Sequence, residues 1–521
     1  MARSAGRSAA LIAAGILLSR IAGLVRQRVF AHYLGLWDAA DALSAAFRIP
    51  NLLQNLFGEG VLSASFIPVY ARLVGQGKSE DAGRVAGAVA GLLGLVVAAI
   101  VLAGVLATPF VVDLLAPGFT GDKRLLTITL VRILFPATGI LVVSAWCLGI
   151  LNSHGKFFLS YAAPVVWNLA IIVAAIVAGR RAEAERLVVV VAWAAVAGSA
   201  LQVLVQLPSV VGLTRTLRVS TDTTSPDVRT VMGNFGPALV GRGVNQISAY
   251  VDGVIASLLG TGAVAGITNA QLLYTLPVSL FGMSVSAAEL PAMSAVQGSE
   301  AERHEALRQR LEDGLHRIAF FIVPCAVAFL ALGHVVAGAV FQTGQFSGTD
   351  SRYVWAILAG SAVGLLASTL SRLSSSTFYA LGDTRTPLRY ALVRVGLTTA
   401  LGFAASLLLP PLLGIERKWG AVGLTATAGF SGWVEFVLLR RRLAARIGPA
   451  RLAPGYLARL WGAAGVAAAA GWGVLLATGR SGPVAQAALV LAPFCLAYGG
   501  MTLLLRVPMA QALLRRGLRR D

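Results

Sequence analysis

Residues 85–106, VAGAVAGLLGLVVAAIVLAGVL, contain no charged side chain and are long enough to cross a lipid bilayer as one helix. Similar apolar stretches recur along the whole chain of 521 residues, of which 57% are hydrophobic and 13% charged. The mean hydropathy is +0.76. Because soluble proteins are about 25% charged, this composition excludes a water-soluble enzyme and indicates a polytopic membrane protein.

The spacing of the apolar stretches predicts an all-α protein with about 14 transmembrane helices. The second span contains Pro50 and is expected to bend there. A capping box, Ser299 to Glu302, opens a polar segment before the ninth span, which we expect as a surface helix or a solvated connector. The predicted spans are residues 8–30, 40–70, 82–115, 124–151, 157–179, 186–212, 229–259, 264–294, 315–341, 352–380, 387–410, 419–440, 457–479 and 483–506.

The distribution of Lys and Arg predicts the orientation of the chain. Most of the cations that give the net charge of +20 fall in loops on the side of the N-terminus. By the positive-inside rule, both termini are then cytoplasmic. Apolar runs separate the cations, which favours an anionic lipid surface over nucleic acid as the partner.

Sequence signals for catalysis and for cofactors are missing. The three Cys lie far apart, the five His are scattered, and no nucleotide-binding or metal-binding motif occurs. We therefore expect no enzyme activity, no metal site and no bound cofactor. Any transport would use an Na⁺ or H⁺ gradient, the membrane potential or the substrate gradient.

Two segments about 225 residues apart resemble each other, which predicts an internal repeat. VLSASFIP at 61–68 corresponds to SVSAAELP at 284–291, and Pro50 corresponds to Pro277. Parallel repeats of six helices are a known transporter plan with the substrate between the halves. The predicted lobes are residues 1–220 and 221–445, followed by two additional helices in 446–521; chance similarity in Ala-rich and Leu-rich sequence is the alternative.

Several charged residues fall inside predicted spans. An Arg near the bilayer centre costs about 2.5–3.5 kcal/mol, so it is a functional candidate by default. Arg20 and Arg26 in the first span and Arg242 in the seventh are candidates for binding an anionic substrate. The alternative for each is snorkelling or pairing with a carboxylate; Arg48 fits either role, and pairing is expected for Arg132, Arg372 and Arg394.

The acidic candidates for gating or charge pairing are Asp41, Glu59 and Asp252. Asp41 and Glu59 are about 27 Å apart along a helix. They therefore cannot form a catalytic carboxylate pair, although either could pair with an Arg of the first span.

Six short motifs resemble those of the MurJ (MviN) lipid II flippases, a family within the MATE-like exporter superfamily. They are SRIAGLVR at 19–26, DAADA at 38–42, RIPNLL at 48–53, FGEG at 57–60, FQTGQF at 341–346 and FYALGDTRTP at 378–387. The resemblance runs from the first span to the end of the chain in the same order.

The resemblance implies alternating access between two six-helix lobes in a bacterial inner membrane. The implied substrate is lipid II, the undecaprenyl-diphosphate-linked peptidoglycan precursor, moved from the inner to the outer leaflet. The family's cavity arginines match Arg20 and Arg26, and its acidic residues match Asp41 and Glu59. The last two helices are implied to form a groove for the lipid tail, and the cell-wall synthesis machinery is an implied partner.

The chain departs from the family pattern in its second half. A basic residue usual in the eighth span falls at Leu272, beside Gln271. We expect Arg242, followed by Asn245, to supply the missing charge, with Gln271 as a further substrate contact. Thr398 and its neighbour replace the carboxylate of a sodium site known in some members, so the coupling ion stays open.

Two other functions remain as alternatives. One is a MATE-like ion-coupled exporter of drugs or of another polyprenyl-linked saccharide. An exporter of cationic drugs would need an acidic cavity, whereas the intramembrane excess here is basic. The other is a membrane scaffold without transport, which predicts no effect of neutralising Arg20 or Arg26.

Overall fold

The computed structural model describes residues 2–214, 216–478 and 481–517; within them, it leaves undescribed the side chains of residues 2–13, 59, 238, 240–245, 247, 248, 516 and 517. The regular structure of the described residues is entirely helical. The prediction of an all-α membrane protein is thus confirmed.

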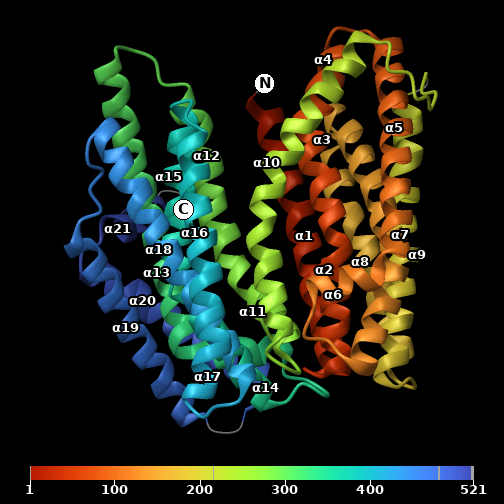
Figure 1. Cartoon of the computed structure of the whole chain (residues 1–521). Helices are drawn as coiled ribbons and strands as arrows, with labels where there is room; N and C mark the ends of the chain where they lie inside the picture. Colours follow the sequence, from red (N-terminus) through yellow and green to blue (C-terminus); the bar gives the residue numbers. More distant parts are fainter. Residues whose placement is uncertain (1, 215, 479–480, 518–521) are drawn as a thin grey trace. The chain divides into compact units, whose positions relative to one another are not determined.

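Internal packing divides the chain into two compact units, Met1–Val264 and Ala265–Asp521, which we describe separately. In the first unit, α7, α8 and α9 lie side by side (Figure 1). Its helices are α1 (Ala2–Leu34), α2 (Asp38–Phe57), α3 (Glu59–Ser65), α4 (Ile67–Gly75), α5 (Ser79–Leu106), α6 (Thr108–Leu115), α7 (Gly121–Ser153), α8 (Phe157–Gly179), α9 (Ala184–Leu213) and α10 (Pro226–Ser257).

The second unit begins within α11 and contains the helices that follow. They are α11 (Ala263–Pro277), a π-helical turn (Val278–Met283), α12 (Ser284–Ser294), α13 (Glu300–Phe341), α14 (Gly348–Ala362), α15 (Leu365–Ala380), α16 (Arg385–Phe403), a second π-helical turn (Ala404–Leu408), α17 (Leu409–Leu412), a 3₁₀ turn (Arg417–Trp419), α18 (Gly420–Ile447), α19 (Pro454–Ala477), α20 (Pro483–Leu504) and α21 (Pro508–Gly517). The predicted lobe boundaries at residues 220 and 445 come from the sequence repeat, whereas the division at Val264 comes from internal packing. The lobe boundaries therefore stay a prediction.

Ten helices of the described chain are long and apolar enough to cross a membrane. The count rises to eleven when α14 and α15, which meet at a bend of 42°, are taken as one span. The predicted number of fourteen therefore remains a prediction.

The second predicted span consists of three helices, α2, α3 and α4, and the expected bend at Pro50 stays a prediction. Pro50 lies inside α2, which ends at Phe57. One break falls at Gly58, between α2 and α3, and a second falls at Phe66, between α3 and α4. A Cβ at Gly58 would lie 2.2 Å from the carbonyl oxygen of Gln54, so this break requires glycine. The next break precedes Pro68, which occupies the first turn of α4, where a missing N–H has no cost.

The polar segment before the ninth span is part of that span's helix. Ser299 and Glu302 form the predicted capping box, and α13 then continues for 42 residues without interruption. Glu289 on α12 lies 3.4 Å from Arg310 and 3.6 Å from Arg317, which ties α12 to this polar part of α13. The expected separate surface helix or connector is therefore wrong, because the capping box starts a single long helix.

Residues 216–220, which precede α10, lie along a row of glycines on α5. The Ser220 amide donates to the Gly87 carbonyl at 3.2 Å. A Cβ at Gly87 would lie 2.0 Å from the Arg218 carbonyl oxygen, and one at Gly91 would lie 2.1 Å from the Ser220 carbonyl oxygen. Only glycine at these positions allows the two backbones to approach so closely.

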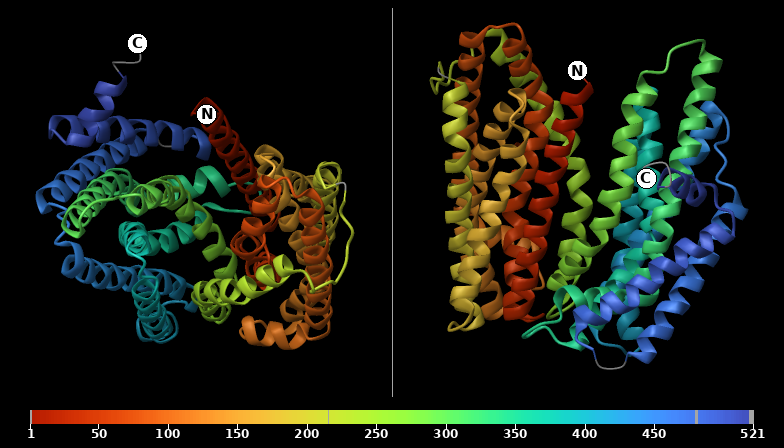
Figure 2. Two further views of the ribbon diagram at one scale, coloured as in Figure 1. Left: turned by 90° about the horizontal axis from the view of Figure 1, so that it is seen from above. Right: turned by 180° about the vertical axis from the view of Figure 1, so that it is seen from behind.

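In the second unit, α19 and α20 pack against each other and against α13 (Figure 2). The Tyr498 hydroxyl donates to the Phe320 carbonyl at 2.7 Å, and the Trp472 indole donates to the Ala331 carbonyl at 3.2 Å. Pro324 has no N–H to offer the Phe320 carbonyl four residues earlier. Tyr498 thus satisfies the acceptor that the proline leaves open.

Candidate functional site

Arg26 on α1 lies inside a cage of aromatic rings. Its guanidinium carbon is 5.8 Å from the centre of the Phe30 ring, 5.7 Å from that of Phe47 and 4.9 Å from that of Trp167. These rings come from α1, α2 and α8. The Trp167 indole donates to the Ala195 carbonyl at 3.1 Å, which fixes the ring nearest to the cation.

The Nε atom of Arg26 is buried and has no hydrogen-bond partner in the described part of the chain. Aromatic faces attract a cation, but they offer it no hydrogen-bond acceptor of carboxylate strength. The cage therefore holds the guanidinium in place and leaves its Nε–H group available to an anion.

Arg20 lies on the same helix, about one and a half turns from Arg26. Its side chain is exposed, as are those of Leu17, Ile21 and Val25 around it. The structure thus gives the two predicted arginines different surroundings, one enclosed by rings and one open.

Arg48 on α2 faces α10 rather than α1. The Tyr250 hydroxyl donates to the Arg48 carbonyl at 3.0 Å, and Asp252 lies within electrostatic range of the Arg48 guanidinium. A Cβ at Gly253 would lie 2.6 Å from Nη1 of Arg48, so the glycine makes room for this side chain. Asp252, a predicted charge-pairing residue, therefore has Arg48 as a neighbour.

Asp41 is fully buried and pairs with Lys123, a residue near the start of α7 that the sequence analysis does not identify as a site residue. Lys123 Nζ lies 2.7 Å from Asp41 Oδ2, and the Gly262 amide donates to the same oxygen at 2.7 Å. Lys123 also lies 2.9 Å from Asp38, which accepts a 2.8 Å hydrogen bond from Thr261. Asp41 is thus held by Lys123 and a backbone amide; its pairing with an arginine of the first span stays a prediction.

Three predicted site residues fall outside the described side chains: Glu59, Arg242 and Asn245. Near the latter two on α10, Gln246 accepts a 3.2 Å hydrogen bond from Asn55 of α2. Gln271 is exposed on α11 in the second unit. The first unit thus brings Arg26, Arg48 and Asp252 into positions with identified neighbours.

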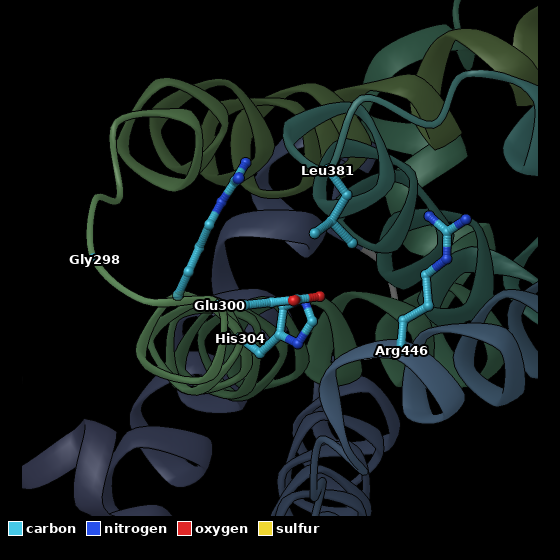
Figure 3. Close-up of a pocket in the computed structure, with 6 residues that line it drawn as sticks. Gly298, Glu300, His304, Leu381 and Arg446 are labelled. Carbon is cyan, nitrogen blue, oxygen red and sulfur yellow. The ribbon is translucent and has the colours of Figure 1, made fainter.

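A polar pocket that is distinct from these residues lies in the second unit. Figure 3 shows Glu300 and His304 side by side at this pocket, which has a volume of about 590 Å³. Its other lining residues are Gly298, Arg303, Leu381 and Arg446. It contains none of the predicted site residues. No group of three or more His, Cys, Asp or Glu in the described chain is arranged to hold a metal ion.

The sequence as a whole matches one family of known proteins. The family model described as "Lipid II flippase MurJ" matches residues 30–492. A lipid II flippase MurJ from Burkholderia cenocepacia is 31% identical over 453 residues, which cover 85% of this chain and 84% of that protein. A probable lipid II flippase MurJ from Rhizobium meliloti is 30% identical over 437 residues, covering 82% and 79% of the two chains.

The fold matches the same group of proteins. A solved lipid II flippase MurJ in an inward closed conformation superposes with a TM-score of 0.77 at 21% identity, over 98% of this chain and 99% of that one. An inward-facing multidrug resistance MATE family transporter of the MOP superfamily gives a TM-score of 0.64 at 19% identity, over 82% and 95%. Because the family model matches most of this chain, the chain belongs to the MurJ family.

Proposed function

We propose that the chain is a lipid II flippase, which moves the undecaprenyl-diphosphate-linked disaccharide-peptide from the inner to the outer leaflet of a bacterial inner membrane. It is a transporter and not an enzyme. Support comes from the family match and from relatives about 30% identical that are named for this activity.

The observation that carries the proposal is the guanidinium of Arg26 within its ring cage, where the buried Nε has no hydrogen-bond partner in the described part of the chain. A diphosphate that leaves water needs a cation with directional donors. Arg supplies bidentate, charge-assisted hydrogen bonds to phosphate oxygens, which Lys cannot reproduce. The aromatic faces add attraction to the cation without competing for its N–H groups.

The remaining substrate contacts are proposed from the sequence. Arg20 shares α1 with Arg26, and Arg242 with Asn245 supplies the positive charge that Leu272 no longer provides. Gln271, beside Leu272, is a further contact.

The acidic residues take the gating or charge-pairing roles. Asp41, Glu59 and Asp252 change partners during the cycle, and Lys123 and Arg48 are the neighbours that the structure supports for Asp41 and Asp252.

Transport proceeds by alternating access of two lobes, residues 1–220 and 221–445, with both termini in the cytoplasm. The helices in 446–521 hold the lipid tail, and anionic lipid and the cell-wall synthesis machinery are partners. An Na⁺ or H⁺ gradient or the membrane potential supplies the energy. The many cationic loop residues support this orientation.

Complementation of a flippase-depleted bacterium tests the function. The chain is expected to restore growth, while the same cells gain no resistance to cationic drugs. Resistance without restored growth would indicate drug export, as in the MATE neighbours. Growth restored equally well after neutralising both Arg20 and Arg26 would contradict the proposed anion site.

A further inference from the structure

One face of α15 carries polar residues where a lipid-facing helix would be apolar. Ser368, Arg372, Ser375 and Tyr379 are exposed or half-buried, and the other side chains of this helix are buried. Their spacing of four, three and four residues places them on one helical face. An Arg that faces lipid is strongly disfavoured, so this face borders water.

Arg372 belongs to a cluster of charges from three helices. Arg394 Nε on α16 lies 3.0 Å from Glu435 Oε2 on α18. Arg372 is within electrostatic range of the same carboxylate. Tyr274 is within electrostatic range of both arginines, and its hydroxyl lies 2.8 Å from the Ser368 hydroxyl. Arg394 pairs with Glu435 and Arg372 lies within its electrostatic range, so these three groups together carry one positive charge in excess.

The cluster lies well inside helices that are candidate membrane spans. Arg394 is about 14 Å from the start of α16, and Glu435 is about 18 Å from the end of α18. Both α16 with its continuation and α18 are apolar enough to cross a membrane. An excess charge at this depth costs free energy, so its presence marks a candidate functional site.

The exposures of the two paired side chains differ. A fraction of 32% of the Arg394 side chain is exposed, but only 12% of Glu435. An anion that approaches from the water-facing side of α15 therefore meets the guanidinium groups before it meets the carboxylate. Guanidinium groups bind phosphate oxygens through paired, charge-assisted hydrogen bonds.

We propose that Arg372 and Arg394 form an anion site for a diphosphate group in the second unit, and that Glu435 occupies these arginines until the anion displaces it. The inference rests on the proposed function, because it assigns a second contact for the same substrate. A carboxylate that acts as a placeholder competes with the ligand. Removing the carboxylate and removing an arginine then have opposite effects on anion affinity.

The test measures binding of undecaprenyl diphosphate to the purified full-length chain by native mass spectrometry, with undecaprenol as the uncharged reference. Glu435→Gln is expected to tighten binding severalfold, and Arg394→Gln and Arg372→Gln to weaken it about tenfold, the effect of losing a charge-assisted hydrogen bond. Arg132→Gln is the matched control, because Arg132 is an exposed arginine on α7 outside the cluster. Inorganic pyrophosphate is the second probe and separates a free anion from a lipid headgroup.

Opposite shifts for Glu435→Gln and Arg394→Gln support the site. Shifts with both probes assign the recognition to the diphosphate itself, and shifts with the lipid alone assign it to a lipid headgroup. If the pair is purely structural, both variants should have a lower melting temperature, and the affinity for the anion should be unchanged in both or decreased in both. Either result overturns the inference. If the unmodified chain does not bind undecaprenyl diphosphate better than undecaprenol, the proposed function itself is contradicted.

Discussion

The guanidinium carbon of Arg26 lies 4.9 Å from the centre of the Trp167 ring, although the two residues belong to α1 and α8. A cation stacked on an aromatic face keeps its position without a carboxylate that would compete with an incoming anion. This relationship explains how aromatic rings from other helices hold the Arg26 guanidinium in place within the first unit.

Removal of the Trp167 ring should weaken the anion site. Trp167→Leu is expected to lower the affinity for undecaprenyl diphosphate about 2- to 30-fold, which corresponds to a cation–π interaction of roughly 0.5–2 kcal/mol. Trp167→Phe keeps a ring and should lose less. Trp193→Leu on α9 is the control, because Trp193 is 59% exposed and away from the cage. Equal affinity in Trp167→Leu and the unmodified chain would remove the ring from the site.

The buried ion pair of Asp41 and Lys123 should contribute far more to the stability of the protein than the exposed ion pair of Asp113 and Arg124. Asp41→Asn removes the buried carboxylate that neutralises the charge of Lys123. Because a buried charge without its partner is costly, we expect the free energy of unfolding to decrease by about 3 kcal/mol. Asp113→Asn removes the partner of Arg124, which lies 2.6 Å away. The two side chains are 53% and 32% exposed, so solvent screens the pair and the loss of stability should be much smaller. Melting temperatures in detergent compare the two, and a similar decrease in both variants would refute the difference.

The glycine row on α5 predicts opposite effects for two identical substitutions. Gly87→Ala places a methyl group against the Arg218 carbonyl and should destabilise the protein by about 1–3 kcal/mol through overpacking. Gly94→Ala meets nothing within 4 Å and should stabilise α5 by roughly 0.5–1 kcal/mol. Thermal unfolding of the two variants measures both signs. Stabilisation by Gly87→Ala would show that residues 216–220 are not held against α5.

A double-mutant cycle tests whether Tyr498 compensates for Pro324. Tyr498→Phe should cost about 1–3 kcal/mol, because the Phe320 carbonyl loses its donor. In the Pro324→Ala background, the restored backbone N–H can pair with this carbonyl, so the same substitution should cost less. Equal costs in both backgrounds would mean that the hydroxyl does not replace the missing helical hydrogen bond.

Local sequence patterns predicted much of the fold. Apolar length and Lys and Arg distribution indicated a polytopic helical protein, and the Ser299 capping box marked the start of α13 correctly. Pro50 lies inside α2, whereas the break after this helix falls at Gly58, which the sequence analysis does not identify. Prolines are tolerated inside membrane helices because other groups satisfy the freed carbonyl. A close backbone contact such as that of Gly58 leaves no comparable signal in the sequence.

Contacts between distant segments could not be predicted in the same way. Arg26 was identifiable as an unusual charge in an apolar helix, but its cage combines rings from three helices. Lys123 lies 82 residues from Asp41 in sequence, and no local pattern marks it as the partner of this carboxylate. Arg394 was expected to pair, yet its partner Glu435 comes from another helix. Each of these pairs depends on helix packing, which single-sequence periodicity does not encode.

The most direct test measures lipid II on the outer leaflet of a flippase-depleted bacterium, as the fraction cleaved by a hydrolase added outside the inner membrane. The chain and its Arg132→Ala variant are expected to restore this fraction, whereas Arg26→Ala at an equal membrane level is expected to leave lipid II inaccessible. Restoration by Arg26→Ala to the level of the unmodified chain, or no restoration by the unmodified chain itself, would contradict lipid II transport through the caged arginine.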